Sequence, residues 1–507
     1  MDSHSLEIAP LDDHNLALLE KVHPAGWTNP EPAGRYNLVV VGAGTAGLVS
    51  AVGAAGLGAK VAIIERDLMG GDCLNFGCVP SKALIASARA MARVRGANEF
   101  GIEVPLGARA DFALAAARMR EIRASIAHND SAERLRGLGI DVYLGTGKFV
   151  ANDAVEVDGK RLTFRRAAIA TGARAAAPPI PGLAETGFLT NETVFSMTEL
   201  PARLAIIGGG PIGCELAQAL RRLGAEVTLL EAMPHVLIRE DRDAAEAVEI
   251  ALRRDGVAIA DNCAILRVER RGAHKILRIE SDRAQSEITV DEIVAGVGRA
   301  PAVEGLGLEA AGVEYDRAAG IHVDDYLRTT NKRIYAAGDC ASELKFTHLS
   351  DAHARILLRN ALFRGSRKVS ALTIPWCTFT DPEIAHVGLS EEDARKRGIK
   401  ITTFTQPMAE VDRALLDGQT QGFVKVHVSA GTDKIVGATI VAAHAGEMIS
   451  ELTLAMAASL GLGKLGEVIH PYPTQAEAIR KVANQYARTR LTPFAAKLFK
   501  RWFAWTR

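Results

Sequence analysis

The chain has 507 residues and no net charge, because 60 Lys and Arg residues balance 60 Asp and Glu residues. This length predicts about three domains of about 150 residues each. The missing net charge excludes the bulk electrostatic attraction that a nucleic-acid partner requires. Six cysteines in so long a chain exclude a disulfide-stapled scaffold, so a close cysteine pair indicates catalytic chemistry. The polar N-terminus contains no apolar signal core, and we expect a cytoplasmic protein.

The first predicted element is an uncharged, glycine-rich segment, residues 36–59, which is long enough to span a bilayer. A strand, a glycine turn and a buried helix explain it better, because residues 37–41 lead directly into a Gly-x-Gly-x-x-Gly turn. The next strand, residues 61–64, ends at an acid. Such a turn lets a pyrophosphate approach the helix N-terminus, while the acid holds ribose hydroxyls. The residues of this expected dinucleotide site are Gly42, Gly44, Gly47 and Glu65.

The same pattern recurs later in the chain. A strand at residues 204–207 leads into a second glycine turn, a helix runs to residue 223, and a strand at 227–230 ends at an acid. In both copies the acid stands 23 positions after the first glycine. The repeat predicts that the chain binds two dinucleotides. The residues of the second expected site are Gly208, Gly210, Gly213 and Glu231.

Two cysteines, Cys73 and Cys78, lie between a glycine pair and a predicted helix, and this spacing indicates a redox-active disulfide. On an ideal helix, residues five apart have Cα atoms about 8–9 Å apart, whereas a disulfide requires about 4.4–6.8 Å. We therefore expect a local distortion, for which Gly77 is suited. Lys82 lies four residues after Cys78 and favours a thiolate there. The alternative is a pair of buried cysteines in a core helix.

The position of the cysteines assigns the two dinucleotides. They follow the first glycine turn, and a flavin can pass electrons to sulfur whereas a nicotinamide cannot readily reduce a disulfide directly. We therefore expect FAD at the first site and a nicotinamide nucleotide at the second. Glu231 favours NADH over NADPH, because a carboxylate repels a 2′-phosphate. Three arginines nearby in the sequence weaken that preference: Arg221, Arg222 and Arg239.

These residues and several further motifs resemble the pyridine nucleotide-disulfide oxidoreductases, the flavoprotein family of dihydrolipoamide dehydrogenase, glutathione reductase and mercuric reductase. The resemblance extends from about residue 36 to about residue 490. The motifs are residues 70–82 (GGDCLNFGCVPSK), 170–172 (ATG), the second glycine turn continuing to Glu215, Gly298-Arg299, 336–339 (AAGD) and 470–477. The resemblance implies an α/β fold with two Rossmann-like domains, for FAD and NAD, and a C-terminal α+β dimerisation domain.

The expected domain limits follow from the motifs and from the change of composition near residue 371. They are an N-terminal extension (1–35), a first FAD-binding part (36–185), an NAD(P)-binding domain (186–305), a returning FAD-binding segment (306–370), a dimerisation domain (371–490) and a basic, aromatic tail (491–507). The dimerisation domain contains no nucleotide turn. In the family this domain forms a homodimer whose last motif reaches the cysteines of the partner subunit.

The resemblance also implies roles for single residues. Cys78 is the thiol against the flavin, Cys73 exchanges with substrate, and Lys82 pairs with Glu215 near the flavin ring. Further residues expected to contact FAD are Gly147, Thr171, Gly172 and Asp339, and Gly298 is expected on the nicotinamide side. Thr347 and His348 open a predicted helix whose N-terminal dipole can stabilise a reduced flavin. His348 therefore has either a flavin role or an ordinary surface role.

The last motif departs from the family pattern. Lipoamide and glutathione reductases have a histidine directly before Pro-Thr, paired with a glutamate five residues later, whereas this chain has Tyr472 at that position and Glu477 five residues later. A tyrosine with a pKa of about 10 is not a base near neutrality, although it can donate a hydrogen bond or a proton. His470 is an alternative base, because residues two apart on an extended segment point the same way.

Tyrosine at this position is the pattern of mercuric reductases, and residues 379–382 and 412–414 resemble that branch too. Those enzymes carry a cysteine pair near the C-terminus, whereas this sequence has no cysteine after Cys377. We expect a ping-pong enzyme in which NADH reduces FAD, FAD reduces the Cys73–Cys78 disulfide, and the dithiol reduces an acceptor. The acceptor is a mercuric or other metal ion, a disulfide such as lipoamide, or another oxidant. The sequence shows no resident metal site.

The tail, residues 491–507, places aromatic and leucine side chains at helical spacing among lysines and arginines. This composition is typical of an interfacial helix on an anionic membrane, and a helix packed on the protein's own dimer is the alternative. A protein of a different class, a redox sensor or a membrane-docked electron donor, is also consistent with such a tail.

Overall fold

The computed structural model describes residues 8–281 and 284–507, and these residues form two compact units. The first unit holds the described residues up to Gly209 together with Ala219–Ala232 and Ala258–Ala371, and the second holds Gly210–Gln218, Met233–Val257 and Leu372–Arg507. Cys73 and Cys78 belong to the first unit. The two parallel sheets whose strands lead into the glycine turns belong to it as well.

The first sheet is built around β1, whose six residues are almost all buried because strands cover it on both sides and helices cover its faces. Parallel pairing joins β3 (Asp141–Leu144), β2 (Val61–Glu65), β1 (Tyr36–Val41), β6 (Lys160–Ile169) and β19 (Ile334–Ala336). Two antiparallel strands, β5 (Ala154–Val157) and β4 (Lys148–Ala151), continue from β6. The segment that is long enough to span a bilayer is therefore β1 and the helix after it.

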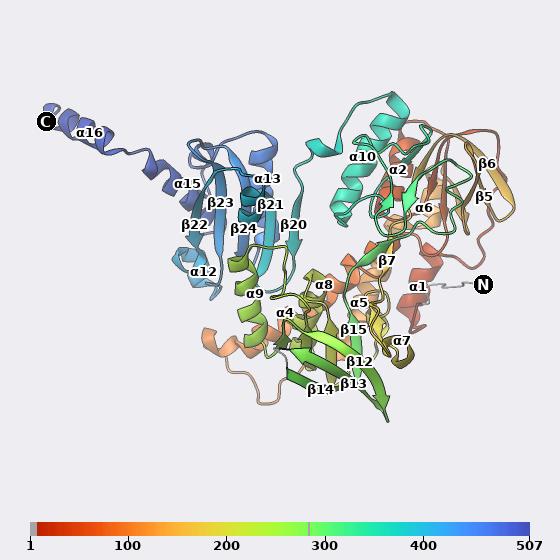
Figure 1. Ribbon diagram of the computed structural model, residues 1–507, viewed down its shortest axis with the longest axis horizontal. Coiled ribbons are helices and arrows are strands. Elements are labelled where there is room, and N and C mark those ends of the chain that lie inside the picture. The colour runs from red at the N-terminus through yellow and green to blue at the C-terminus, as the bar shows by residue number, and fades with distance from the viewer. Residues whose placement is uncertain (1–7, 282–283) are drawn as a thin grey trace. The chain divides into compact units, whose positions relative to one another are not determined.

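Two helices cover one region of this sheet side by side (Figure 1). They are α2 (Thr45–Gly56), which follows the first glycine turn, and α10 (Thr347–Phe363). They approach closely at Gly53, where an added Cβ would lie 2.5 Å from a methyl group of Leu358. A small residue at this position is what allows the contact between the helices.

The second sheet repeats the order of the first. It is fully parallel and runs β11 (Ala258–Ala260), β10 (Glu226–Leu230), β9 (Arg203–Ile207), β15 (Glu292–Ala295) and β8 (Leu189–Thr190). In each sheet the strand before a glycine turn has the next strand of the chain on one side and a much later strand on the other. This reversal of strand order is the place where doubly wound sheets bind ligands.

Both glycine turns adopt the same backbone conformation at that place. Gly42 has a φ of +103° and Gly208 has a φ of +102°. Residues that carry a side chain rarely adopt such values. An added Cβ would lie 2.3 Å from the Ala170 carbonyl oxygen in the first turn and 2.8 Å from the Gly296 carbonyl oxygen in the second. The two Rossmann-like units expected from the sequence are confirmed by this repeated topology.

The second unit contains an antiparallel sheet in the order β20 (Pro375–Thr378), β21 (Glu383–Gly388), β24 (Ile435–Ala442), β23 (Phe423–Ser429) and β22 (Ile401–Pro407). Helices α13 (Ala445–Ala457) and α15 (Glu477–Thr489) pack against this sheet (Figure 1). Their apolar faces and the inner face of the sheet form one buried core. The expected α+β character of this segment is confirmed.

The N-terminal extension, whose role the sequence did not indicate, covers an exposed edge of the first sheet. After α1 (Asp13–Val22), the Trp27 indole donates to the Val142 carbonyl at 3.1 Å. Asn29 makes two hydrogen bonds with the backbone of Leu144, at 2.9 Å and 2.8 Å. Because these bonds satisfy part of β3, the extension protects a strand edge from pairing with other chains.

A three-stranded antiparallel sheet was also not expected. It consists of β12 (Ala264–Arg271), β13 (His274–Ser281) and β14 (Ala284–Val290). Further helices are α3 (Gly71–Asn75), α4 (Cys78–Arg95), α5 (Phe112–Ile126), α6 (Ala132–Gly137), α7 (Leu183–Thr186), α8 (Pro211–Leu223), α9 (Arg242–Arg254), α11 (Glu391–Lys396), α12 (Asp412–Leu416), α14 (Leu462–Leu465) and α16 (Pro493–Trp505). Within residues 8–281 and 284–507, no helix combines the length and the apolar character needed to cross a membrane.

We predict that Gly42→Ala destabilises the protein and lowers its FAD content. The new Cβ meets a backbone carbonyl at 2.3 Å, and relieving this overlap costs about 3 kcal/mol or more. The matched control is Gly58→Ala, since Gly58 has a φ of +84° but nothing within 4 Å of an added Cβ. The control should lose only about 1 kcal/mol, from backbone strain alone. The measurements are the thermal midpoint and the flavin-to-protein ratio. Equal losses in both variants would show that the overlap is relieved at no cost.

Candidate active site

The cysteine segment is a broken helix. α3 ends at Asn75 and α4 begins at Cys78, and the distortion expected between the two cysteines lies at Phe76 and Gly77. An added Cβ at Gly77 would lie 2.7 Å from a carboxylate oxygen of Asp72 and 3.1 Å from its carbonyl oxygen. Gly77 is therefore needed for this close approach, which brings the two cysteine side chains to the same end of α4.

The two cysteines are free thiols with unequal acidity. The pKa of Cys78 is lowered to about 6, because the Cys73 thiol and Thr347 hydrogen-bond to it and Lys82 adds a positive charge, which together outweigh the opposing loss of hydration. The pKa of Cys73 is raised by the hydrogen bond to Cys78 and by burial. The Thr347 hydroxyl lies 3.3 Å from the Cys78 sulfur. Cys78 and Thr347 are the first residues of α4 and α10, so two helix N-termini also favour a thiolate.

One arginine links the cysteine segment to the AAGD motif. The Arg299 guanidinium lies 3.2 Å from the Asp72 carboxylate and 2.9 Å from the Asp339 carboxylate. Burial raises the pKa of both acids, and the positive charge of Arg299 opposes that rise. Asn191 also donates to Asp72, at 3.3 Å. Arg299 thus links Asp72, which directly precedes Cys73, to Asp339, which is expected to contact FAD.

A second buried network holds the segment between the cysteines. The Arg123 guanidinium donates to the Asn75 carbonyl at 2.7 Å and to the Asn15 side chain at 2.5 Å. The Asn75 amide donates to the carbonyls of Met69, at 3.0 Å, and Gly71, at 2.8 Å. Asn15 belongs to α1, so the N-terminal extension supports the turn that carries both cysteines.

The acid of each Rossmann-like unit bonds to the second residue of its own glycine turn. The Ala43 amide donates to Glu65 at 2.6 Å, and the Gly209 amide donates to Glu231 at 2.5 Å. Glu65 also accepts from the Asp67 amide at 2.8 Å, and burial raises its pKa. In both sites the acid expected to hold a ribose therefore also fixes the conformation of the turn.

The first turn fits the pyrophosphate of FAD. Gly44 precedes α2 and has no side chain, and no side-chain hydrogen bond caps that helix. Its first amides are consequently directed at an approaching anion. The glycine turn and the cysteine segment meet backbone to backbone, since an added Cβ at Gly71 would lie 2.6 Å from the Gly44 Cα. Gly71, with a φ of +58°, is therefore needed for this close approach between the two segments.

The other residues expected to contact FAD have varied surroundings. Thr171 donates its hydroxyl to the Ala302 carbonyl at 2.7 Å. Gly172 has a φ of +72°, and an added Cβ at Gly147 would lie 3.1 Å from Ile64. His348 is exposed and stacks on Phe346, with ring centroids 5.3 Å apart.

A neighbouring histidine has a clearer position. His353 is 2% exposed, and its Nδ1 accepts a hydrogen bond from the Gly338 amide at 3.4 Å. Burial lowers its pKa to about 4, so the ring is neutral and can accept this bond at physiological pH. His353 therefore supports the turn that carries Asp339.

On the nicotinamide side, Gly298 has a φ of +116°, and its carbonyl accepts from the Ala176 amide at 3.1 Å. Glu215 accepts from the Phe379 amide at 2.8 Å within the second unit. Its expected pairing with Lys82, which belongs to the first unit, stays a prediction.

The C-terminal motif differs from the simple histidine-glutamate pattern in its partners. The Tyr472 hydroxyl donates to Asp412 at 2.9 Å, not to Glu477, and this carboxylate raises the pKa of the tyrosine. Glu477 instead accepts from Arg480 at 2.5 Å. The His470 side chain is only 4% exposed, whereas Tyr472 is 69% exposed. The Nε2 atom of His470 lies 3.1 Å from a carboxylate oxygen of Glu451.

Sequence reasoning missed several residues of this region. Arg299 was recognised only as part of a motif, and Thr347 only as the start of a helix. Asp72 and Asp412 lie within motifs of the sequence, but no pattern indicates Arg299 and Tyr472 as their partners. The Asn15–Arg123 contact has no sequence signal, because the two residues lie far apart in the chain.

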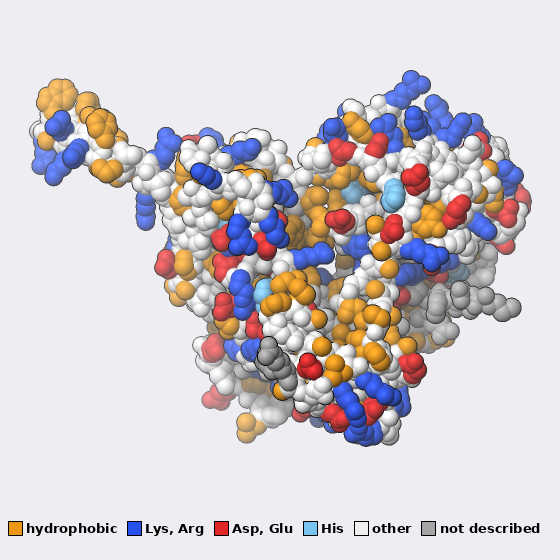
Figure 2. Space-filling model, in the orientation of Figure 1, with side chains coloured by type: hydrophobic (Ala, Val, Ile, Leu, Met, Phe, Trp, Pro, Cys, Tyr) orange, Lys and Arg blue, Asp and Glu red, His pale blue; other side chains and the backbone are white. Residues whose placement is uncertain are grey.

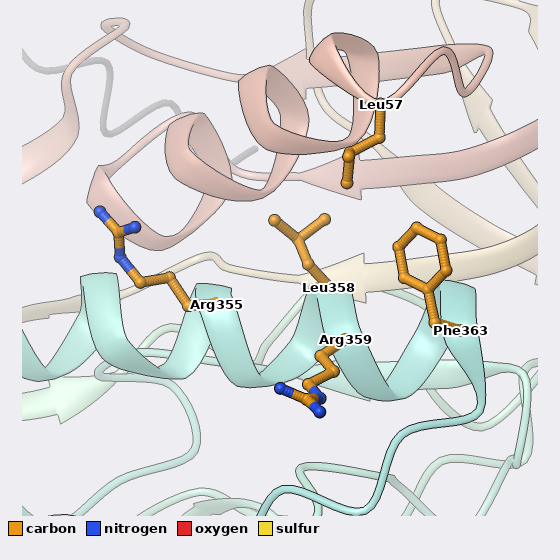
Figure 3. Close-up of a pocket in the computed structure, with 5 residues that line it drawn as sticks. All are labelled: Leu57, Arg355, Leu358, Arg359 and Phe363. Carbon is orange, nitrogen blue, oxygen red and sulfur yellow. The ribbon is translucent and has the colours of Figure 1, made fainter.

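A shallow depression on α10 lies away from this chemistry. It is lined by Leu57, Arg355, Leu358, Arg359 and Phe363 (Figure 3). Leu57 follows the last residue of α2, and the 12 residues of that helix place it about 18 Å from the glycine turn. This depression therefore has no part in the site described above.

Comparison with known proteins identifies the family. The profile described as "Pyridine nucleotide-disulphide oxidoreductase" matches residues 36–354, and the dimerisation domain of the same family matches residues 374–483. The chain belongs to this family. Pyridine nucleotide-disulphide oxidoreductases use FAD and NAD(P)H, and the dimerisation domain supports a homodimer.

The individual relatives have different names. Mercuric reductase of Bacillus cereus is 36% identical over 88% of this chain and 70% of its own length. Dihydrolipoyl dehydrogenase of Thermus scotoductus is 34% identical over 89% of this chain and 97% of its own length. The solved HOCl-induced flavoprotein disulfide reductase RclA from Escherichia coli is 32% identical, with a TM-score of 0.79 over 89% of this chain and 99% of that one.

We predict that the Cys78 thiolate persists down to a pH of about 6. Because the folded protein lowers this pKa, the thiolate is present above pH 6 and is lost as the pH falls through that value. In the two-electron-reduced holoprotein, the long-wavelength thiolate-to-flavin absorption band measures it. Thr347→Val should move the midpoint upward by removing a hydrogen bond, and Thr347→Ser should not. A wild-type midpoint near 8.5, the value of an ordinary cysteine, would contradict the lowered pKa.

We predict that Arg299→Met lowers both the stability and the FAD content of the protein. Breaking a fully buried ion pair costs about 3–5 kcal/mol. Because Asp72 keeps 27% of its side-chain exposure, we expect about 2–3 kcal/mol here. Arg317→Met is the control, since Arg317 pairs with Glu304 on the surface and both side chains are exposed. It should change the unfolding free energy by less than about 0.5 kcal/mol. The same loss in both variants would show that the Arg299 contacts do not stabilise the site.

Proposed function

We propose that this chain is an NADH-dependent flavoprotein reductase whose Cys73–Cys78 pair reduces a thiophilic metal ion, with mercuric ion as the first candidate. The observation that carries this choice is the Tyr472–Asp412 hydrogen bond of 2.9 Å. The carboxylate raises the pKa of Tyr472, so this side chain is not a base near neutrality. Disulfide exchange requires such a base, whereas reduction of a metal ion bound to thiolates does not.

The relatives support the same choice. Several of the similar proteins are mercuric reductases, including those of Bacillus cereus and Staphylococcus aureus, at 36% and 34% identity. A solved Cu(II) complex of RclA, at 31% identity and a TM-score of 0.80, adds a relative that binds a metal ion. The acceptor of this chain remains our proposal.

The chain's own residues have distinct tasks in this scheme. The Gly42 turn and Asp339 bind FAD, and the Gly208 turn binds the nicotinamide nucleotide. Bound FAD supplies the route by which two electrons pass from the nicotinamide to the disulfide. Cys78, with its lowered pKa, holds a thiolate, and the less acidic Cys73 keeps its proton until it meets the acceptor.

The electron balance of the acceptor step is simple. The reduced pair binds Hg²⁺ through both sulfurs and gives it two electrons. The metal leaves as elemental mercury, and the two sulfurs join as a disulfide. The proton of Cys73 is released to solvent, because Cys78 already holds a thiolate.

A specific observation favours a second candidate, reduction of a disulfide or another oxidant. The sequence has no cysteine after Cys377, so it lacks the cysteine pair by which mercuric reductases deliver the ion. The dihydrolipoyl dehydrogenase and the HOCl-induced reductase among the relatives are consistent with this candidate. A redox sensor, in contrast, would change state without sustained turnover.

We infer NADH as the reductant and a cytoplasmic homodimer as the working form. The Glu231 carboxylate lies at the second glycine turn, where it repels a 2′-phosphate. A cytoplasmic location fits a dithiol that must remain reducible. The dimerisation domain provides the second subunit, from which the Tyr472 motif is expected to reach the cysteines.

The test is an anaerobic reduction of the holoprotein with NADH, repeated with NADPH, followed by separate titrations with mercuric ion and lipoamide. We predict a thiolate-to-flavin absorption band after NADH, faster reduction by NADH than by NADPH, and sustained NADH oxidation with mercuric ion. Tyr472→Phe should slow turnover about ten-fold through loss of one hydrogen bond. Tyr472→His should increase lipoamide turnover, since histidine is a base near neutrality.

Two outcomes would contradict the proposal. Mercuric ion that abolishes the band and stops NADH oxidation is an inhibitor, and the second candidate then applies. Full turnover of Cys73→Ser with mercuric ion would remove the dithiol from the mechanism. Cys263→Ser is the control, because Cys263 is buried in the core of the first unit. This substitution should leave turnover with mercuric ion unchanged.

A further inference from the structure

The C-terminal helix α16 is unlike the rest of the chain in both charge and exposure. After Glu477 the sequence contains no acidic residue, although the whole chain is neutral. In this stretch the basic residues are Arg480, Lys481, Arg488, Arg490, Lys497, Lys500, Arg501 and Arg507. A net positive charge is thus concentrated at one end of a neutral protein.

None of the residues of α16 is buried. Its large apolar side chains are all more than half exposed, including Trp505 at 78% and Phe494 at 77%. Two of the four tryptophans of the chain lie in these 13 residues. The exposed apolar side chains are Phe494, Leu498, Phe499, Trp502, Phe503 and Trp505. So many exposed aromatic rings on one helix indicate a surface that binds something.

The two kinds of side chain occupy opposite faces of α16. With a rotation of about 100° per residue, the six apolar side chains fall within an arc of about 180°, and Lys497, Lys500 and Arg501 fall within the remaining arc. Figure 2 shows hydrophobic side chains gathered along one side of this helix and basic side chains along the other. Such a helix can lie flat in a bilayer surface, with its rings among the acyl chains and its cations at the headgroups.

We propose that α16 docks this reductase on an anionic membrane surface. The helix has 13 residues and is about 20 Å long, which is too short to cross a hydrocarbon core of about 30 Å, so it lies in the interface. Tryptophan and phenylalanine are the residues that prefer this depth. Each basic residue near an anionic leaflet adds affinity.

The charge of α16 also argues against a second copy of this helix as the partner that covers its apolar face. Two identical helices that each carry Lys497, Lys500 and Arg501, with no acid nearby in the sequence, repel one another. An anionic bilayer satisfies the apolar face and the basic face at the same time. The proposal does not depend on the identity of the electron acceptor.

The test uses the FAD-loaded full-length protein and two kinds of vesicle, phosphatidylcholine alone and phosphatidylcholine with phosphatidylglycerol. We expect co-sedimentation with the anionic vesicles and a blue shift of tryptophan emission, since Trp502 and Trp505 enter an apolar environment. Lys497→Gln, Lys500→Gln and Arg501→Gln combined should weaken binding about 100-fold, at about five-fold for each charge. Trp502→Ala with Trp505→Ala should abolish the emission shift.

A matched control removes the same number of charges from the same unit. Lys396→Gln, Arg397→Gln and Lys400→Gln lie on the surface around α11 and should change vesicle binding by less than about two-fold. All variants should keep the FAD content and the NADH oxidation rate with a soluble acceptor. Equal binding to both vesicle types, or loss of binding in the control triple, would overturn the proposal. Absence of vesicle binding together with a monomer after deletion of residues 491–507 would assign α16 to the dimer instead.

Discussion

The buried contact between Arg299 and the carboxylates of Asp72 and Asp339 connects the parts of the site that depend on each other. Asp72 directly precedes Cys73, and Asp339 ends the AAGD turn, so a single guanidinium joins the thiol segment to the segment that is expected to contact FAD. Without that charge, two mostly buried acids would be either protonated or mutually repulsive. The same region is closed by the backbone contact between Gly44 and Gly71. The ion pairs of Arg299 and the close backbone contact between Gly44 and Gly71 therefore hold the cysteines beside the first glycine turn.

Within this frame, the two thiols differ because their surroundings differ. Cys78 lies at the start of α4 and beside the start of α10, and it receives hydrogen bonds from Cys73 and Thr347. Cys73 has a neighbouring thiolate and the Asp72 carboxylate, which oppose its ionisation. An asymmetric pair is useful chemically, since one sulfur can hold charge while the other remains available for exchange. The Asn15–Arg123–Asn75 network keeps the turn between them rigid.

The C-terminal motif differs from the histidine-glutamate pattern of lipoamide and glutathione reductases. Tyr472 bonds to Asp412 and His470 is enclosed beside Glu451, so neither side chain resembles a free histidine base. This arrangement supports the metal-ion acceptor that we propose. The helix α16 adds a second feature, an exposed surface of basic and aromatic side chains for which we propose a docking role. Both features lie in the second unit, whereas the cysteines and the first glycine turn lie in the first.

The sequence by itself determined the two glycine turns, the acids 23 positions later, the broken helix at Gly77 and the α+β C-terminal segment. These features are local, because backbone conformation and hydrophobic periodicity depend on residues close together in the chain. Only the tertiary structure decided that Thr347 bonds to Cys78, that Arg299 joins Asp72 to Asp339, and that Tyr472 bonds to Asp412 and not to Glu477. It also decided that the N-terminal extension supports the cysteine turn. Each of these contacts joins residues far apart in sequence, and no local pattern records which distant side chains folding brings together.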